Sequence, residues 1–250
     1  LLQGVAALKH FQDAYKLNPG LTESLADARA VYWELGKLPM VQKLLLLELK
    51  AVGGGGRAAE LYRALGDVLS DQGDLEGATD AYKKALQAGA KVDELLADAQ
   101  LQGEEWQERI GELLRIAHEA PTSAERCDAF VRAARIARRF APGEFEEILV
   151  KAYAANPCDP AAAALYETLL VDEERTDVIL ETQQAVLAEI EDPKARAAAA
   201  FAFGARWAQR HHNPEVAARF LEEALRLDPG LEPAFNFLRE RYGQEEGDWE

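Results

Sequence analysis

Cysteine and long apolar runs are scarce in this sequence of 250 residues. The two cysteines, Cys127 and Cys158, are too few for a disulfide framework, which favours a reducing, cytoplasmic compartment. The longest apolar run, Leu44 to Leu47, is far shorter than the roughly 20 apolar residues that a membrane-spanning helix needs. We therefore expect a cytoplasmic protein that does not insert into a membrane.

Positive charge is also in short supply, with 28 basic residues against 44 acidic ones and a formal net charge of -16. Such a surface repels the phosphates of nucleic acids and the head groups of anionic lipids. We therefore expect no nucleic-acid partner. At the same time, 48% of the residues are hydrophobic, which is enough for a substantial core and predicts a folded, soluble protein.

Sustained strand-like alternation is missing too, and helix-breaking residues recur at a regular spacing instead. The breakers are Pro121, Pro157, Pro193 and Pro229, preceded along the chain by Pro19, the glycines at 53–56 and Gly89. The four later prolines stand 36 residues apart, and the earlier breakers follow at about 32 to 37 residues, the range of helical repeats. The whole chain is therefore periodic.

Between the breakers, apolar residues recur every three or four positions, as in Leu61, Leu65 and Val68. This spacing indicates amphipathic helices. Each period also has a second breaker near its middle, such as Gly73-Asp74. Every period therefore predicts a helix, a turn and a second helix.

Helices of about 12 to 18 residues are marginal alone in water, so these pairs must stack on their neighbours. The sequence predicts an all-α fold, a right-handed α-solenoid of antiparallel helical hairpins that forms a single domain over residues 1–250. Six hairpin repeats with a partial repeat at each end are expected at 1–19, 20–56, 57–90, 91–120, 121–156, 157–192, 193–229 and 230–250.

Three of these periods share a pattern of large and small residues at fixed spacing. Its members are Tyr62, Leu65, Gly66, Leu69, Gly73, Asp74, Ala78, Tyr82 and Ala85; Phe201, Gly204, Ala205, Ala208, Ala217, Leu221, Ala224 and Pro229; and Ala7, Phe11, Ala14 and Pro19. The pattern resembles the tetratricopeptide repeat (TPR) family, in which small residues let two helices approach and large ones fill the remaining gaps. Residues 91–192 depart from it, with Arg132 where a leucine is usual.

The two ends of the chain also resemble parts of repeats. The first helix, up to Leu17, resembles the second half of a repeat, and Gly247-Asp248 resembles the turn at Gly73-Asp74. Since natural solenoids normally end in polar capping helices, we expect the chain to be a segment of a longer array.

The TPR resemblance implies a non-catalytic scaffold for protein–protein interaction, which binds a peptide or helix of a partner protein through its concave groove. Abundant alanine and arginine are typical of a GC-rich bacterial genome, so the scaffold could belong to a large bacterial multi-protein assembly. The alternative is a regulatory or sensor TPR domain that switches an attached enzyme or signalling output.

A basic stripe on one predicted helix is the candidate contact surface. The candidate partner-binding residues are Arg132, Arg135 and Arg139 on this helix, with Arg206 and Arg210 at comparable places in a later repeat. In one interpretation these guanidinium groups bind the carboxylates of an acidic partner segment. In the other they pair within the protein with Glu144, Glu146 and Glu147, or lie in water.

Nothing in the sequence singles out a catalytic, cofactor or metal site. Cysteine and histidine can act as a nucleophile and a base, as Cys127 and His118 would have to, but the sequence places no third group to orient them. The glycines at 53–56 lack the Lys-Ser/Thr ending of a phosphate-binding loop. We therefore expect no enzyme activity, no catalytic residues, no metal and no cofactor.

Two further segments have two interpretations each. Residues 38–49 contain more leucines than one buried stripe needs, which indicates either packing on both sides or an exposed hydrophobic partner site. The glycines at 53–56 form either a hinge or a lengthened loop.

Trp33, Trp106 and Trp207 lie on apolar helix faces, so we expect them in the core.

Overall fold

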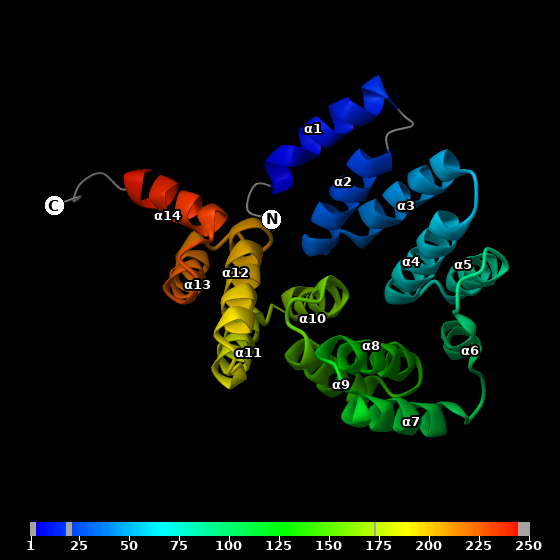
Figure 1. Cartoon of the computed structure of the whole chain (residues 1–250). Coiled ribbons are helices and arrows are strands. Elements are labelled where there is room, and N and C mark those ends of the chain that lie inside the picture. Colours follow the sequence, from blue (N-terminus) through cyan, green and yellow to red (C-terminus); the bar gives the residue numbers. More distant parts are fainter. Residues whose placement is uncertain (1–3, 19–21, 173, 245–250) are drawn as a thin grey trace. The chain divides into compact units, whose positions relative to one another are not determined.

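The computed structural model describes residues 4–18, 22–172 and 174–244, and all regular structure within these ranges is helical (Figure 1). Its 14 helices are α1 Gly4–Leu17, α2 Thr22–Glu34, α3 Leu38–Val52, α4 Gly56–Gln72, α5 Leu75–Gln87, α6 Asp93–Gln100, α7 Trp106–Glu119, α8 Ser123–Phe140, α9 Pro142–Ala155, α10 Pro160–Asp172, α11 Thr176–Glu189, α12 Pro193–Gln209, α13 Pro214–Leu227 and α14 Glu232–Gln244. The breaker Pro19 and the turn at Gly247-Asp248 lie outside the described residues. None of the described helices combines the length and the apolarity that crossing a membrane requires.

The helices follow the periodicity of the sequence. Each of the six full periods holds two helices to within one residue, from α2 and α3 in residues 20–56 to α12 and α13 in residues 193–229. Most contacts between elements join helices that are consecutive in the chain. The expectation of an all-α chain whose helices pack with their sequence neighbours is therefore confirmed.

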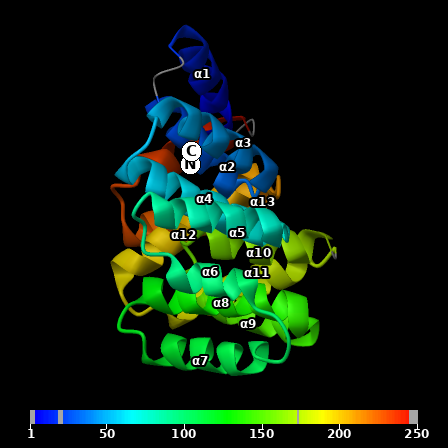
Figure 2. The same cartoon turned by 90° about the vertical axis from the view of Figure 1, so that its right-hand side faces the viewer.

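The chain forms two compact units, and the boundary between residues 168 and 169 falls inside α10. The first unit comprises residues 6–168, and within it α4, α5, α6, α8 and α7 follow one below another in Figure 2. The second unit comprises residues 4 and 5 and the described residues from 169 to 244, and α12 and α13 make its closest pair.

The α4–α5 hairpin shows how the local sequence sets helix ends and helix spacing. Gly73 has a φ of 83°, in the left-handed region that glycine adopts without strain, and its N–H donates to the last turn of α4 and ends that helix. The Asp74 carboxylate then accepts the N–H of Gly77 at 2.9 Å and caps α5. Across the hairpin, Gly66 lies so close to Tyr82 that a Cβ at residue 66 would overlap the tyrosine ring.

In the second unit, aromatic side chains join α12 to its neighbours. The ring of Phe203 meets the edge of Phe220 on α13, with their centroids 5.5 Å apart. Trp207 is buried, and its Nε1 donates to Oε1 of Gln183 on α11 at 2.6 Å. Trp207 therefore lies in the core, as expected from the sequence.

The leucine-rich helix α3 has one buried and one exposed side. Val41 and Leu45 are fully buried, whereas Leu46 is 42% exposed. The core that contains Val41 and Leu45 continues into α4 and α5. The hydrophobic packing of the first unit is thus continuous across the glycines at 53–56.

A buried carboxylate adds a polar link in the same region. Glu48 on α3 has no exposed side-chain surface, and its oxygens accept from Nε of Arg29 at 2.6 Å and from Nη2 of Arg57 at 3.4 Å. A buried carboxylate is tolerated only when it is paired in this way. Glu48 therefore ties α2 and α4 to α3.

Candidate functional site

The arginine stripe expected on α8 lies against two earlier helices. Arg132 donates from Nε to Oδ2 of Asp98 at 2.8 Å and from Nη2 to Oε2 of Glu94 at 2.9 Å, both on α6. Arg135 binds both carboxylate oxygens of Asp71, at the end of α4, at 2.6 and 3.1 Å. We call these two arginines, together with the carboxylates that they bind, the arginine–carboxylate network. It joins residues that are up to 68 positions apart in the chain.

Helix α6 is the centre of this network and is only 8 residues long. Its Glu94 and Asp98 lie one turn apart and bind arginines from two helices, since Arg109 of α7 also donates to Asp98 Oδ1 at 2.7 Å and to Glu94 at 3.3 Å. The hydrogen bond and the charge of Arg132 lower the pKa of Glu94. At Arg132, where the resemblance noted in the sequence implies a leucine, the side chain instead makes these ion pairs.

Asp67 on α4 links the same arginine face to α5. It accepts the hydroxyl of Tyr82 at 2.8 Å, and Nη1 of Arg135 lies 3.3 Å from the same oxygen. Burial raises the pKa of Asp67, and the positive charge of Arg135 opposes this shift without cancelling it. Burial also raises the pKa of Tyr82, so its hydroxyl keeps the proton that it donates.

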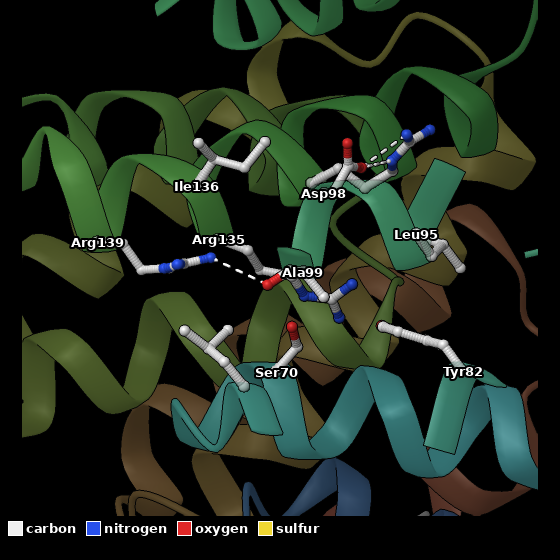
Figure 3. A pocket seen from close by; sticks show the side chains of 10 residues that line it. Ser70, Tyr82, Leu95, Asp98, Ala99, Arg135, Ile136 and Arg139 are labelled. Carbon is white, nitrogen blue, oxygen red and sulfur yellow. Dashed lines mark hydrogen bonds and ion pairs between the residues drawn. The ribbon is translucent and has the colours of Figure 1, made fainter. Parts of the chain in front are cut away.

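Two more arginines of α8 bind the carbonyl ends of helices. Arg138 donates to two carbonyls in the last turn of α4, at 2.6 and 2.7 Å. Arg139 donates to the carbonyls of Ala99 and Leu101 at the end of α6, at 3.3 and 3.2 Å, and Figure 3 shows it beside Ala99. Carbonyls in a last helical turn lack intrahelical donors and carry partial negative charge, so guanidinium groups satisfy and neutralise them.

A small cavity lies between the arginines of α8 and the helices α4, α5 and α6. It measures about 20 Å³ and borders Tyr82, Asp98 and Arg135, three of the side chains labelled or drawn in Figure 3. That volume is room for about one water molecule. The donors of Arg132, Arg135 and Arg139 bind groups of α4 and of α6 with its C-terminal end, and leave little space between these helices.

Arg132 and Arg135 pair within the protein, as one of the two interpretations of the sequence expected, but with other acids. The sequence pointed to Glu144, Glu146 and Glu147 of α9, whereas the acids bound by Arg132 and Arg135 lie on α4 and α6. They could not be identified from the sequence because the pairs join different periods.

The other two candidate arginines lie in the second unit, at the end of α12. Arg206 is only 2% exposed, so its guanidinium belongs to the interior of that unit. Arg210 is the C-terminal cap residue of α12, and its backbone N–H donates to the carbonyl of Arg206 at 2.8 Å. The structure therefore places Arg206 and Arg210 in different surroundings from Arg132 and Arg135.

A larger groove of about 680 Å³ opens beside α8, within the first unit. Its walls come from α2, α4, α7, α8 and the start of α10. All but α7 are the first helices of their periods. The groove lies in the range of about 300–1,000 Å³ that is typical of ligand-binding clefts, which makes it the candidate functional site.

Apolar and acidic side chains share the walls of this groove. The side chains that define its character are Trp33 on α2, Asp67 on α4, Ile116 on α7, Glu125, Asp128 and Val131 on α8, and Asp159 before α10. Asp159 is held in place because its Oδ1 accepts the N–H groups of Ala161 and Ala162, at 3.0 and 2.8 Å, and so caps α10.

Cys127 lies in the wall between these acids. It is buried, and this burial raises the pKa of its thiol, with the charges of Asp159 and Asp128 acting in the same direction. A thiol in such surroundings stays protonated, and the thiolate is the nucleophilic form. The geometry therefore gives Cys127 no activation as a nucleophile.

Of the residues that line the groove, Arg132 and Arg135 were expected from the sequence to bind a partner, whereas its acidic residues were not. Asp128 and Asp159 belong to different periods, and no spacing rule brings them together. Trp33 was expected in the core; it is partly buried, packs against the core that contains Val41 and Leu45, and also lines the groove. Trp106 stacks on Phe140 with ring centroids 5.9 Å apart.

Compared with known protein families and with curated proteins, the chain matches none. Among the residues that the structure describes, no group of three or more His, Cys, Asp or Glu side chains is arranged to hold a metal ion.

Proposed function

We propose that this chain is a TPR-like solenoid that acts as a non-catalytic scaffold and binds a segment of a partner protein in the groove beside α8. Stacked helical hairpins present extended concave surfaces on which peptides and helices dock. Two helices in each full period, packed mainly against their sequence neighbours, support this architecture.

One observation carries the proposal: four first helices, α2, α4, α8 and α10, share one groove of about 680 Å³. In TPR arrays the first helices of successive hairpins line the binding surface. A groove that these helices build together is therefore the site that such a scaffold would use.

In this proposal the arginines of α8 support the groove and do not contact the partner. Arg132 and Arg135 line its wall, but their donors already bind the carboxylates of α4 and α6. Fixed side chains keep a binding surface in shape, so that less entropy is lost when the partner docks.

The test is photo-crosslinking from two alanine positions in the protein. Ala124 lines the groove on α8, whereas Ala154 is an exposed residue of α9 outside it. With a photoreactive amino acid at either position, we expect partner crosslinks in source-cell extract from position 124 and not from position 154. Equal crosslinking from both positions, or none from position 124, would contradict the proposal.

The regulatory alternative stays a prediction. It would use the same groove and needs an output domain that responds to binding, so the crosslinking test also identifies the surface for that function.

A further inference from the structure

The groove beside α8 has negative charge that the protein does not neutralise. Its basic wall residues are Arg63, Arg132 and Arg135. Arg132 is bound by Asp98 and Glu94, and Arg135 by Asp71 and Asp67. Arg63 lies 3.9 Å from Asp67. Every guanidinium group of the wall therefore already faces a carboxylate of the protein.

The acids at the other side of the groove are differently placed. Asp128 is exposed on α8 and has no hydrogen-bond or ion-pair partner among the described residues. Asp159 faces the same groove from the loop before α10, where its bonds go to backbone N–H groups and not to a cation. Glu125, one turn before Asp128, accepts only the hydroxyl of Thr122, at 2.8 Å. Three carboxylates thus line the groove without a basic partner.

Apolar side chains complete the site. Trp33 and Ile116 are partly buried in the wall, and Val131 is 5% exposed, one turn from Asp128 along α8. Apolar walls with a few charged groups are the usual composition of ligand-binding sites, in which the apolar surface buries the ligand and the polar groups fix its orientation. A lysine or arginine suits these walls, since its aliphatic stem packs on apolar surface while its charged end reaches a carboxylate.

We propose that the groove binds a cationic segment, with a lysine or arginine side chain of the partner between Asp128 and Asp159 and apolar partner residues against Trp33, Ile116 and Val131. The inference rests on the proposed function and names the chemistry of the partner. It differs from the acidic partner expected from the sequence, because Arg132 and Arg135, the arginines of that expectation that line the groove, already bind carboxylates of the protein. The net charge of -16 also favours approach of a cation over approach of an anion.

The test uses three fluorescein-labelled peptides of 12 residues, built from repeats of Ala-Leu-Lys, Ala-Leu-Glu or Ala-Leu-Gln. Binding to the whole chain is followed by fluorescence anisotropy. We expect the lysine peptide to bind at least about tenfold more tightly than the glutamine peptide and the glutamate peptide to bind most weakly. Tighter binding of the glutamate peptide would overturn the inference.

Matched variants separate the groove from general attraction to an acidic protein. Asp128→Asn and Asp27→Asn make the same change in net charge, and both residues are exposed on helices, but Asp27 of α2 is not part of the groove wall. We expect Asp128→Asn to weaken binding of the lysine peptide by about three- to tenfold and Asp27→Asn by less than about twofold. Equal weakening by both variants would show non-specific attraction and refute the inference.

A neutral substitution that fills the groove distinguishes the two proposals. Ala124→Trp should abolish the binding of the lysine peptide. If it abolishes binding of the glutamate peptide instead, the groove remains a binding site and only the cationic partner is refuted. If the variant changes the binding of none of the peptides, the inference fails, while the crosslinking from position 124 decides the proposed function independently.

Discussion

Loss of the Arg135 guanidinium should be one of the most damaging single changes in the first unit. Arg135→Met keeps much of the side-chain volume but removes two hydrogen bonds to Asp71, at 2.6 and 3.1 Å, and the contact at 3.3 Å with Asp67. The side chain of Asp71 is 1% exposed, so its charge would be left buried without a partner. Removing one partner of such a buried pair costs about 3–5 kcal/mol.

The matched control is Arg115→Met on α7. Arg115 bonds to Glu119 at 2.8 Å, but both side chains are more than half exposed, at 61% and 62%. An exposed pair one turn apart contributes only about 0.3–0.5 kcal/mol. The same chemical change should therefore have about a tenfold smaller effect on the free energy of unfolding.

Urea unfolding followed by circular dichroism measures the difference. With a slope of about 2 kcal/mol per molar urea, Arg135→Met should lower the midpoint of the first unit by about 1.5–2.5 M and Arg115→Met by no more than about 0.3 M. Hydrogen exchange should accelerate in peptides from α4 and α8, whereas α12 and α13, which hold no residue of the network, should keep their protection.

A second substitution checks the cause. In the Arg135→Met background, Asp71→Asn removes the buried charge and should recover part of the lost stability, because no unpaired ion remains. If Arg135→Met costs no more than Arg115→Met, or if Asp71→Asn destabilises the variant further, the buried-charge explanation is wrong.

Three further predictions use the same unfolding measurements. Gly66→Ala should destabilise the first unit by about 1–3 kcal/mol, because the new methyl group would overlap the Tyr82 ring. The control, Gly111→Ala, has open space around the new methyl group and should stabilise the unit by about 0.5–1 kcal/mol. If Gly66→Ala is stabilising, Gly66 and Tyr82 do not approach as closely as described. Glu48→Ala should cost about 3–5 kcal/mol, since it leaves the two arginines that Glu48 binds without their carboxylate, and a loss below about 1 kcal/mol would mean that those arginines find other partners. Burial raises the pKa of Asp67, so the Asp67 carboxyl group holds its proton more tightly in the folded protein than in the unfolded chain. Protonation of Asp67 therefore adds to the free energy of unfolding. This contribution is complete below the ordinary pKa of 3.8 and is lost as the pH rises through the raised pKa. The stability of the native protein relative to Asp67→Asn should therefore increase from pH 7 to pH 4.5, and an unchanged difference would contradict the raised pKa.

The helices and their pairing could be predicted from the sequence, because both depend on local chemistry. Regularly spaced prolines and glycines mark where helices end, and the Gly73-Asp74 pair ends α4 and caps α5 with groups that the sequence displays directly. The small residue at Gly66 and the large one at Tyr82 likewise face each other as the repeat pattern implies.

The candidate site could not be predicted in the same way, because its residues come from different periods. The stripe on α8 was recognised as a basic face, but its partners depend on the short helix α6, which lets Arg135 reach Asp71 on α4. The convergence of Asp128 and Asp159 on one groove depends on how successive hairpins stack. The spacing of charged residues along one helix shows which of them share a face. It does not show which residues of other helices contact that face.

The reach of Arg135 past α6 limits how this protein can be lengthened or shortened. Tandem arrays are often treated as strings of interchangeable modules, where one unit can be duplicated or deleted and its neighbours simply close up. Here the bonds from α8 to both α4 and α6 fix the distance between periods 57–90 and 121–156. A swap of the intervening period for a standard repeat would move the guanidinium away from its carboxylate, so these three periods must be inherited, and engineered, as one piece.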